Sequence, residues 1–239
     1  MAEPLTRPLA VVLGVGPGLG AALARRFAER YAIALIARQA DYLERVAAEI
    51  KAGGGEAFAV PADVSDQAAL AAAFVAIRKI GNPEILIYNA AMRPFGTLME
   101  TKPSTFENTW RVNAFGAFLA AKEVVPAMLE AGHGVILFTG ATAGTKPFPS
   151  SAAFGPAKFA MRGLAQVMAR DLGPKGIHVA YVNIDGPIDM PFIRQRMPNA
   201  QDQDLLKPSA IAETYWHLAH QDRSCWTQEI DVRPFKEKF

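Results

Sequence analysis

The 239-residue sequence predicts an α/β fold in which helices cover both faces of a parallel sheet. Short apolar segments alternate with longer amphipathic or alanine-rich segments, which is the pattern of repeated strand–helix units. The apolar segments are rich in Val, Ile and Leu without polar alternation, as expected for strands that are buried on both faces. A glycine-rich turn follows the first segment and opens a helix. Together these observations predict one doubly wound sheet of about seven strands.

Seven segments fit short buried strands, each bounded by turn or loop residues. In chain order they are Leu9–Leu13, Ala32–Ala37, Ala57–Val60, Ile85–Tyr88, Gly134–Phe138, His178–Asn183 and Glu229–Val232. Because crossovers between parallel strands are right-handed, we expect a ligand crevice at the carboxyl ends of these strands.

Six longer segments fit helices between these strands. They are Leu19–Tyr31, Asp41–Ala52, Gln67–Lys79, Thr105–Leu129, Ala153–Leu172 and Ser209–His220. Ser104 and Glu107 form an S-x-x-E pattern, which predicts a capping box at the start of the fourth helix. Gly53-Gly54-Gly55 and Gly173-Pro174 are expected to end the second and fifth helices.

We expect residues 1–239 to form a single domain, because neither a linker-like segment nor a charge block divides the chain. The segment Met190–Leu206 contains two prolines and many polar residues, and it is predicted to be irregular. A mobile lid over the crevice is one interpretation of it, and a plain surface excursion is the other.

Composition excludes several classes of function. The net charge is only +2 and Lys and Arg are spread along the chain, so we expect no nucleic-acid partner. We find no secretory signal pattern and no apolar stretch approaching the ~20 residues that span a bilayer, so no membrane partner is expected. The single Cys225 fits a reducing compartment, and the predicted location is the cytoplasm. His217 and His220 are interpreted as surface residues, and no metal site is expected.

The glycine-rich turn has the spacing Gly-x-x-x-Gly-x-Gly, formed by Gly14, Gly18 and Gly20, with Gly16 between the first two. Gly14 permits a sharp exit from the strand, Gly18 lets the backbone approach a pyrophosphate, and Gly20 lets the helix pack on the sheet. The helix that begins at Leu19 offers free N–H groups to phosphates. The sequence therefore predicts a Rossmann-type site for a nicotinamide dinucleotide.

The end of the second predicted strand indicates which dinucleotide is preferred. An acidic residue there would bind the ribose 2′-hydroxyl, but the sequence has Ala37 followed by Arg38. A guanidinium pairs well with a 2′-phosphate, so NADP(H) is favoured and NAD(H) remains possible. A solvated surface arginine is the alternative interpretation of Arg38.

Further segments make the sequence resemble the short-chain dehydrogenase/reductase family over almost its full length. The resemblance implies roles in binding the dinucleotide for Asp63-Val64, for Asn89-Ala90 and for Lys158, which matches the family's ribose-binding lysine. It also implies that Gly186 and Ile188 lie against the nicotinamide, with the Ile188 backbone facing the carboxamide. Asn113 matches the helix asparagine that anchors a water in the family's proton relay.

The same resemblance locates two departures. Alignment of Gly134–Gly144 puts Ala141 where the family has its catalytic serine, and Phe154 stands where the catalytic tyrosine precedes Lys158. The two positions are thirteen residues apart, the separation that is usual in the family, so both hydroxyl groups are absent and not merely displaced. Loss of one positioned acid lowers rates by ~10²–10⁴.

Other groups are candidate proton donors. Thr142 follows the serine position, and Ser150 and Ser151 precede Phe154. The serines are interpreted either as helix caps or as loop hydroxyls near Lys158. Asp185 stands where the family usually has proline, and it is either a raised-pKa acid or a loop carboxylate.

Two functions remain open. The first is an NADP(H)-dependent oxidoreductase with an altered proton donor, acting on a small carbonyl, alcohol or activated alkene. The second is a dinucleotide-binding sensor or scaffold that has lost the chemistry. The helices Thr105–Leu129 and Ala153–Leu172 carry apolar residues on more than one face, so we expect a dimer or tetramer. These apolar residues are Phe115, Phe118, Leu119, Phe159, Met161, Leu164 and Val167.

Overall fold

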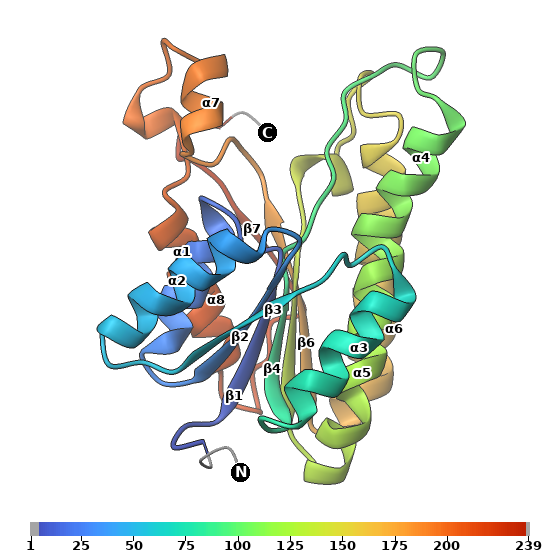
Figure 1. Cartoon of the computed structure of the whole chain (residues 1–239). Coiled ribbons are helices and arrows are strands. Elements are labelled where there is room, and N and C mark those ends of the chain that lie inside the picture. The colour runs from blue at the N-terminus through green and yellow to red at the C-terminus, as the bar shows by residue number, and fades with distance from the viewer. Residues whose placement is uncertain (1–4, 238–239) are drawn as a thin grey trace.

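The computed structural model describes residues 5–237, and its centre is a seven-stranded parallel sheet (Figure 1). The strand order is β3-β2-β1-β4-β5-β6-β7, so the doubly wound α/β prediction is confirmed. The chain moves outward from β1 in one direction and returns to β4 on its other side, which creates a switch point between these two strands. The strands are β1 Leu9–Leu13, β2 Ala32–Ala37, β3 Ala57–Pro61, β4 Pro83–Tyr88, β5 Gly134–Thr139, β6 Ile177–Ile184 and β7 Glu229–Val232.

Helices form a layer on each face of the sheet (Figure 1). One layer holds α1 Leu19–Ala28, α2 Ala40–Ala52 and α8 Pro208–Ala219. The other holds α3 Gln67–Arg78, α4 Pro103–Trp110, α5 Gly116–Ala131 and α6 Phe154–Leu172. Alternate residues of β1 supply the two cores. Leu9, Val11 and Leu13 pack under the second layer, and Ala10 and Val12 pack under the first.

The segment predicted as one helix over Thr105–Leu129 is instead two helices joined by a π-helical turn at Arg111–Phe115. The predicted capping box is wrong. The helix already begins at Pro103, with Lys102 as a cap residue that makes no side-chain hydrogen bond. Proline suits a first helical position because its φ is fixed and it needs no hydrogen-bond acceptor there. Ser104 therefore lies inside the first turn.

By length and composition, the helical stretch Pro103–Ala131 could cross a membrane, because an 18-residue window within it has a mean hydropathy of 1.3. This finding departs from the expectation of no sufficiently apolar stretch. In the structure Ala117, Ala120 and Val124 are buried against the sheet, as in the core helix of a globular domain. A helix covering a sheet buried on both faces needs such an apolar side.

The segment Met190–Leu206 is more regular than predicted. It contains α7 Pro191–Arg196 and a 3₁₀ turn at Asp202–Asp204. Arg194 joins these two pieces, because its guanidinium donates to both carboxylate oxygens of Asp189 and to Asp202. Polar residues that predicted a loop therefore form a local ion-pair network beside the carboxyl ends of the strands (Figure 1).

Candidate active site and cofactor groove

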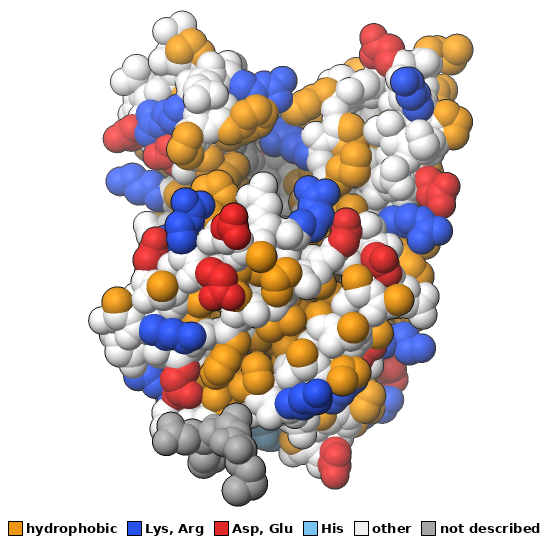
Figure 2. Space-filling view, viewed as in Figure 1, with side chains coloured by type: hydrophobic (Ala, Val, Ile, Leu, Met, Phe, Trp, Pro, Cys, Tyr) orange, Lys and Arg blue, Asp and Glu red, His pale blue; other side chains and the backbone are white. Residues whose placement is uncertain are grey.

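Two cavities lie at the carboxyl ends of the strands, with volumes of about 750 and 540 Å³. Gly14, Gly16, Asn89 and Ala91 line both cavities, so together they form one continuous groove over the β1–β4 switch point. Figure 2 shows the molecule hollowed at this end, with Lys and Arg side chains around the hollow. The position matches the crevice expected from the sequence.

The first glycine fixes the floor of the groove. Gly14 has φ +84°, and its N–H donates to Ile36 O at 2.8 Å. A Cβ at Gly14 would lie 2.4 Å from Ala90 N, so no larger residue fits. The Asn89 amide donates to Gly14 O at 2.9 Å and ties the ends of β1 and β4 together. The predicted residues Gly14, Asn89 and Ala90 thus form one packed unit.

The geometry of the turn fits a bound pyrophosphate. Gly16 lines both cavities, and no atom lies within 4 Å of where its Cβ would be, so a side chain there would project into open groove. Leu19 and Gly20 line the larger cavity at the start of α1. Gly18 lines neither cavity. Its φ of +133° requires glycine, and a Cβ there would lie 2.3 Å from Met190 Sδ.

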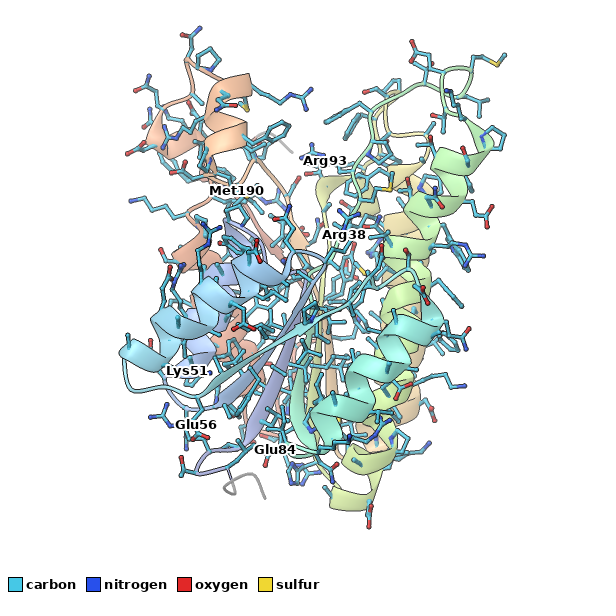
Figure 3. All side chains as sticks on the ribbon, in the orientation of Figure 1. Arg38, Lys51, Glu56, Glu84, Arg93 and Met190 are labelled. Atoms are coloured by element: carbon cyan, nitrogen blue, oxygen red, sulfur yellow. The ribbon has the colours of Figure 1, made fainter. Side chains whose placement is uncertain are left out.

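Arg38 and Asp63 lie at the far end of the smaller cavity, together with Val64 and Ala90 (Figure 3 labels Arg38). Burial raises the pKa of Asp63, but hydrogen bonds from the Ser65 hydroxyl and N–H and the charge of Arg38 outweigh it, and the pKa is lowered overall. Asp63 is therefore held ionised. Arg38 is solvent-exposed at the groove rim, where a guanidinium can meet a ribose phosphate.

Lys158, Phe154 and Ala141 line the larger cavity together. The Lys158 ammonium is almost fully buried and donates to Thr139 O at 2.8 Å, while its Nζ lies 5.6 Å from the centroid of the Phe154 ring. Burial lowers the pKa of Lys158 to about 7. Neither Phe154 nor Ala141 offers a transferable proton, whereas Lys158 is an acidic group that lies close to the position of the missing tyrosine.

The substitute hydroxyl groups differ in their environments. The Ser151 hydroxyl donates to Phe148 O and accepts from Phe148 N. Ser151 precedes α6 and is absent from the lining of both cavities, so it closes a local loop. Thr142 lines the larger cavity, and its hydroxyl makes only a long contact of 3.5 Å to Ile184 O. Thr142 therefore keeps access to a substrate, and Ser151 does not.

Asn113 lies within the π-helical turn and is fully buried. Its amide donates to Met92 O and to Thr109 O, both at 2.9 Å. Within residues 5–237 nothing donates to its Oδ1, which leaves that atom able to accept from a water. The π-turn directs this amide toward the β4 loop beside the groove, and π-bulges of this kind occur often at functional sites.

Residues of the loop after β6 differ in function, since some line the cavity and one forms buried ion pairs. Gly186 and Ile188 line the larger cavity, where the sequence places the nicotinamide. Asp185 is buried and does not line it. Its Oδ2 pairs with Lys146 at 3.0 Å and with Arg233 at 3.4 Å. Of the two interpretations of Asp185, the structure therefore supports the loop carboxylate. Its ion pair with Arg233 connects the end of β6 to the chain after β7.

Four large apolar side chains line the larger cavity, namely Phe148, Phe154, Phe192 and Met197. Sequence reasoning missed Arg93, Arg196 and Met190, which also line the larger cavity (Figure 3 labels Arg93 and Met190). The position of Arg93, shortly after the Asn89 segment, was an available signal. The position of Arg196 was not, because its segment was predicted to be irregular.

A model of the short chain dehydrogenase family matches residues 8–199. The chain therefore belongs to this family of dehydrogenases and reductases, as the glycine spacing and Lys158 indicate.

Relatives and solved structures agree with this assignment. "Inactive 2-(S)-hydroxypropyl-CoM dehydrogenase 2" of Xanthobacter autotrophicus is 40% identical over 151 residues, 63% of this chain. The aligned part is 64% of that relative, so it spans less than two thirds of the relative's length. A short-chain dehydrogenase from Rhodopseudomonas palustris is 34% identical, with TM-score 0.83 over 97% of this chain and 100% of the other. A metagenomic short-chain oxidoreductase in complex with NADP is 30% identical, with TM-score 0.83 over 95% and 96%.

Proposed function

We propose that this protein is an NADP(H)-dependent oxidoreductase of the cytoplasm, acting on a small carbonyl, alcohol or activated alkene. The observation that carries the proposal is the continuous groove, which runs from Arg38 past Gly16 to Lys158. An elongated dinucleotide fits such a groove, with its adenosine ribose beside Arg38 and its nicotinamide beside Lys158. The bound nicotinamide supplies or accepts a hydride, and the residues of the larger cavity hold the substrate against it.

The preference for NADP(H) is tested by the change Arg38→Ala. We expect NADPH to bind the unaltered protein at least several-fold tighter than NADH, because Arg38 meets the 2′-phosphate and Ala37 offers no carboxylate to the ribose. The variant is expected to lose most of that preference. Fluorescence titrations with both nucleotides measure it, and Arg30→Ala, which removes an exposed arginine at the opposite end of β2, is the control. Equal affinities in the unaltered protein would disprove the assignment of NADP(H).

We propose Lys158 as the proton donor for carbonyl reduction. Its ammonium lines the cavity beside Phe154, and a pKa of about 7 lets it release a proton at neutral pH. When hydride reaches the carbonyl carbon, a Lys158 proton passes to the developing alkoxide, and the amine then recovers a proton from solvent. Thr142 is the second candidate, but an aliphatic hydroxyl is a much weaker acid than an ammonium with a lowered pKa.

A second candidate function is nucleotide binding without catalysis. The specific observation in its favour is that Ala141 and Phe154 replace both hydroxyl donors. A panel of ketone and enoyl substrates, monitored by NADPH oxidation, separates the two functions. Turnover that falls when Lys158 is replaced supports the enzyme. Tight NADPH binding without turnover on any substrate supports the binding protein.

We also propose that two or more copies associate through the surface formed by α4, α5 and α6. Large apolar side chains are exposed on these three helices, of which α4 and α5 run end to end and α6 lies beside them in the same layer (Figure 1). They include Phe106, Trp110, Phe118, Leu129, Phe159 and Val167. An apolar patch that spans several helices is typical of a contact with a second copy. Sedimentation at micromolar concentration should show a species of at least twice 25.8 kDa, and a purely monomeric species would contradict this proposal.

A further inference from the structure

Two arginine side chains from different segments line the larger cavity. Arg93 comes from the loop after β4, and Arg196 comes from the end of α7. Arg93 Cζ lies 5.1 Å from the centroid of the Phe95 ring, and Arg196 Cζ lies 4.8 Å from the same centroid. One aromatic ring therefore holds both guanidinium groups at the same part of the cavity.

Neither guanidinium is neutralised by a carboxylate in the part of the chain that the structure describes. The contacts of Arg93 are to the rings of Phe95 and Phe154, and those of Arg196 are to the rings of Phe95 and Phe192. Arg194, two residues before Arg196, behaves in the opposite way, since it pairs with Asp189 and Asp202. Carboxylates were thus available on this segment, yet Arg196 is left directed into the cavity.

The electrostatics of the cavity also favour an anion. Its charged lining residues are Arg93, Lys158 and Arg196, with Glu237 as the one carboxylate, which pairs with none of them within residues 5–237. Desolvation and the repulsion of Arg196 lower the pKa of Arg93. Two like charges held close together beside apolar rings are unfavourable unless an anion joins them, and guanidinium groups bind oxyanions through paired hydrogen bonds.

The pair lies close to the reaction position. Arg93 Cζ is 5.9 Å from the centroid of the Phe154 ring, which marks the site of the absent tyrosine. An anionic group on Arg93 is therefore only a few bonds from a carbonyl or alcohol carbon beside Phe154 and Lys158. Phe95 and Phe148 line the same cavity with their rings 6.3 Å apart, and such apolar side chains suit a short hydrocarbon connection.

We propose that Arg93 and Arg196 form an oxyanion-binding subsite of the active-site cavity. The subsite selects small carbonyl or alcohol substrates that carry a carboxylate, sulfonate or phosphate group a few bonds from the reacting carbon. This inference rests on the proposed function, since it names the substrate class of the same site. Because α7 carries one of the two arginines, the anion also links the segment Met190–Leu206 to the β4 loop.

The test compares ligands of one shape that differ in charge. The NADPH-loaded protein is titrated calorimetrically with 4-oxopentanoate, 3-oxobutane-1-sulfonate, 3-oxobutylphosphonate and the neutral 4-oxopentanamide. At least one anion is expected to bind roughly tenfold to hundredfold tighter than the amide, which is typical of a hydrogen-bonded charge pair. The order of the three anions identifies the natural group. Equal affinity for all four ligands, or no detectable binding of any anion, would overturn the proposal.

Variants assign the effect to the two arginines. Arg93→Gln and Arg196→Gln are each expected to remove most of the preference for the anion, and to leave the affinity for the amide within about twofold. Arg170→Gln, at the far end of α6, removes the same charge. This control should change neither the preference for the anion nor the affinity for the amide. A preference that survives the double Gln variant overturns the proposal, and so does a loss of NADPH affinity with anion binding unchanged.

The result is separable from the proposed function. Titrations of nucleotide alone and of anion alone are run on the same protein. Arginine-dependent anion binding without any NADPH binding would disprove the cofactor proposal and support the subsite. NADPH binding without discrimination between the anions and the amide would support the cofactor proposal and disprove the subsite.

Discussion

The double change Ala141→Ser and Phe154→Tyr restores the two missing hydroxyl groups. We expect it to raise the rate of reduction of activated ketones by at least ~10²-fold. Both side chains line the cavity of about 750 Å³, and each change adds only a single oxygen. The new phenol would have two cations near its ring, since Lys158 Nζ and Arg93 Cζ are 5.6 and 5.9 Å from the present ring centroid. Neighbouring positive charge lowers the pKa of a phenol and makes it a better acid at neutral pH.

The measurement is NADPH oxidation by the parent and the variant on one panel of ketones. Phe148→Tyr is the matched control, because it adds the same oxygen to another phenylalanine of the cavity without restoring the donor position. If the parent already reduces these ketones at ordinary enzymatic rates, Phe154 does not remove an essential acid. If a folded, NADPH-binding variant gains nothing, the geometry of the pocket has diverged and the binding-protein alternative is strengthened.

Replacement of Lys158 by methionine is expected to stabilise the nucleotide-free protein below neutral pH. The lysine titrates near 10.5 in the unfolded chain and at about 7 in the folded protein. Between these values the unfolded state binds more protons, so the stability of the parent rises with pH. Below about pH 7 the folded protein bears the whole penalty of a buried charge, roughly 5 kcal/mol for such a difference in pKa.

Methionine has a similar shape, but it leaves the Thr139 carbonyl without the hydrogen bond that Lys158 donates. This loss offsets about 1–2 kcal/mol of the gain in the free energy of unfolding. We therefore expect Lys158→Met to be roughly 3 kcal/mol more stable at pH 6, and to lose this advantage steadily as the pH rises from 7 toward 10.5. Urea unfolding at pH 6, 7.5 and 9 measures the change, with the exposed Lys79→Met as control. An advantage that stays constant or grows with pH would show that Lys158 is not destabilised by its charge.

The same variant is expected to lose function as it gains stability. Lys158 matches the ribose-binding lysine of the family and is the proposed proton donor, so NADPH affinity and turnover should both fall. A buried cation that weakens the folded protein and serves the site is consistent with the general trade-off between stability and activity.

Much of the fold was predictable, because strand and helix patterns are local. The seven strands were located to within two residues at each end, and the glycine turn was placed between β1 and α1. The fourth helix was predicted less well. Its hydrophobic pattern runs through Arg111–Phe115 without interruption, while the π-turn depends on contacts of Asn113 with the distant β4 loop. Periodicity does not encode such contacts.

The candidate site also has features that the sequence predicts and features that depend on the folded structure. Residue type and spacing were enough to predict the doubly wound fold, the glycine turn, the missing hydroxyl groups at Ala141 and Phe154, and the position of Lys158 after them. The tertiary structure decided which groups are charged, paired or accessible. It buries Lys158, pairs Asp185 with Lys146 and Arg233, and brings Arg93 and Arg196 to one cavity. These properties depend on desolvation and on Coulomb interactions between groups far apart in the chain, and only the folded arrangement sets those distances.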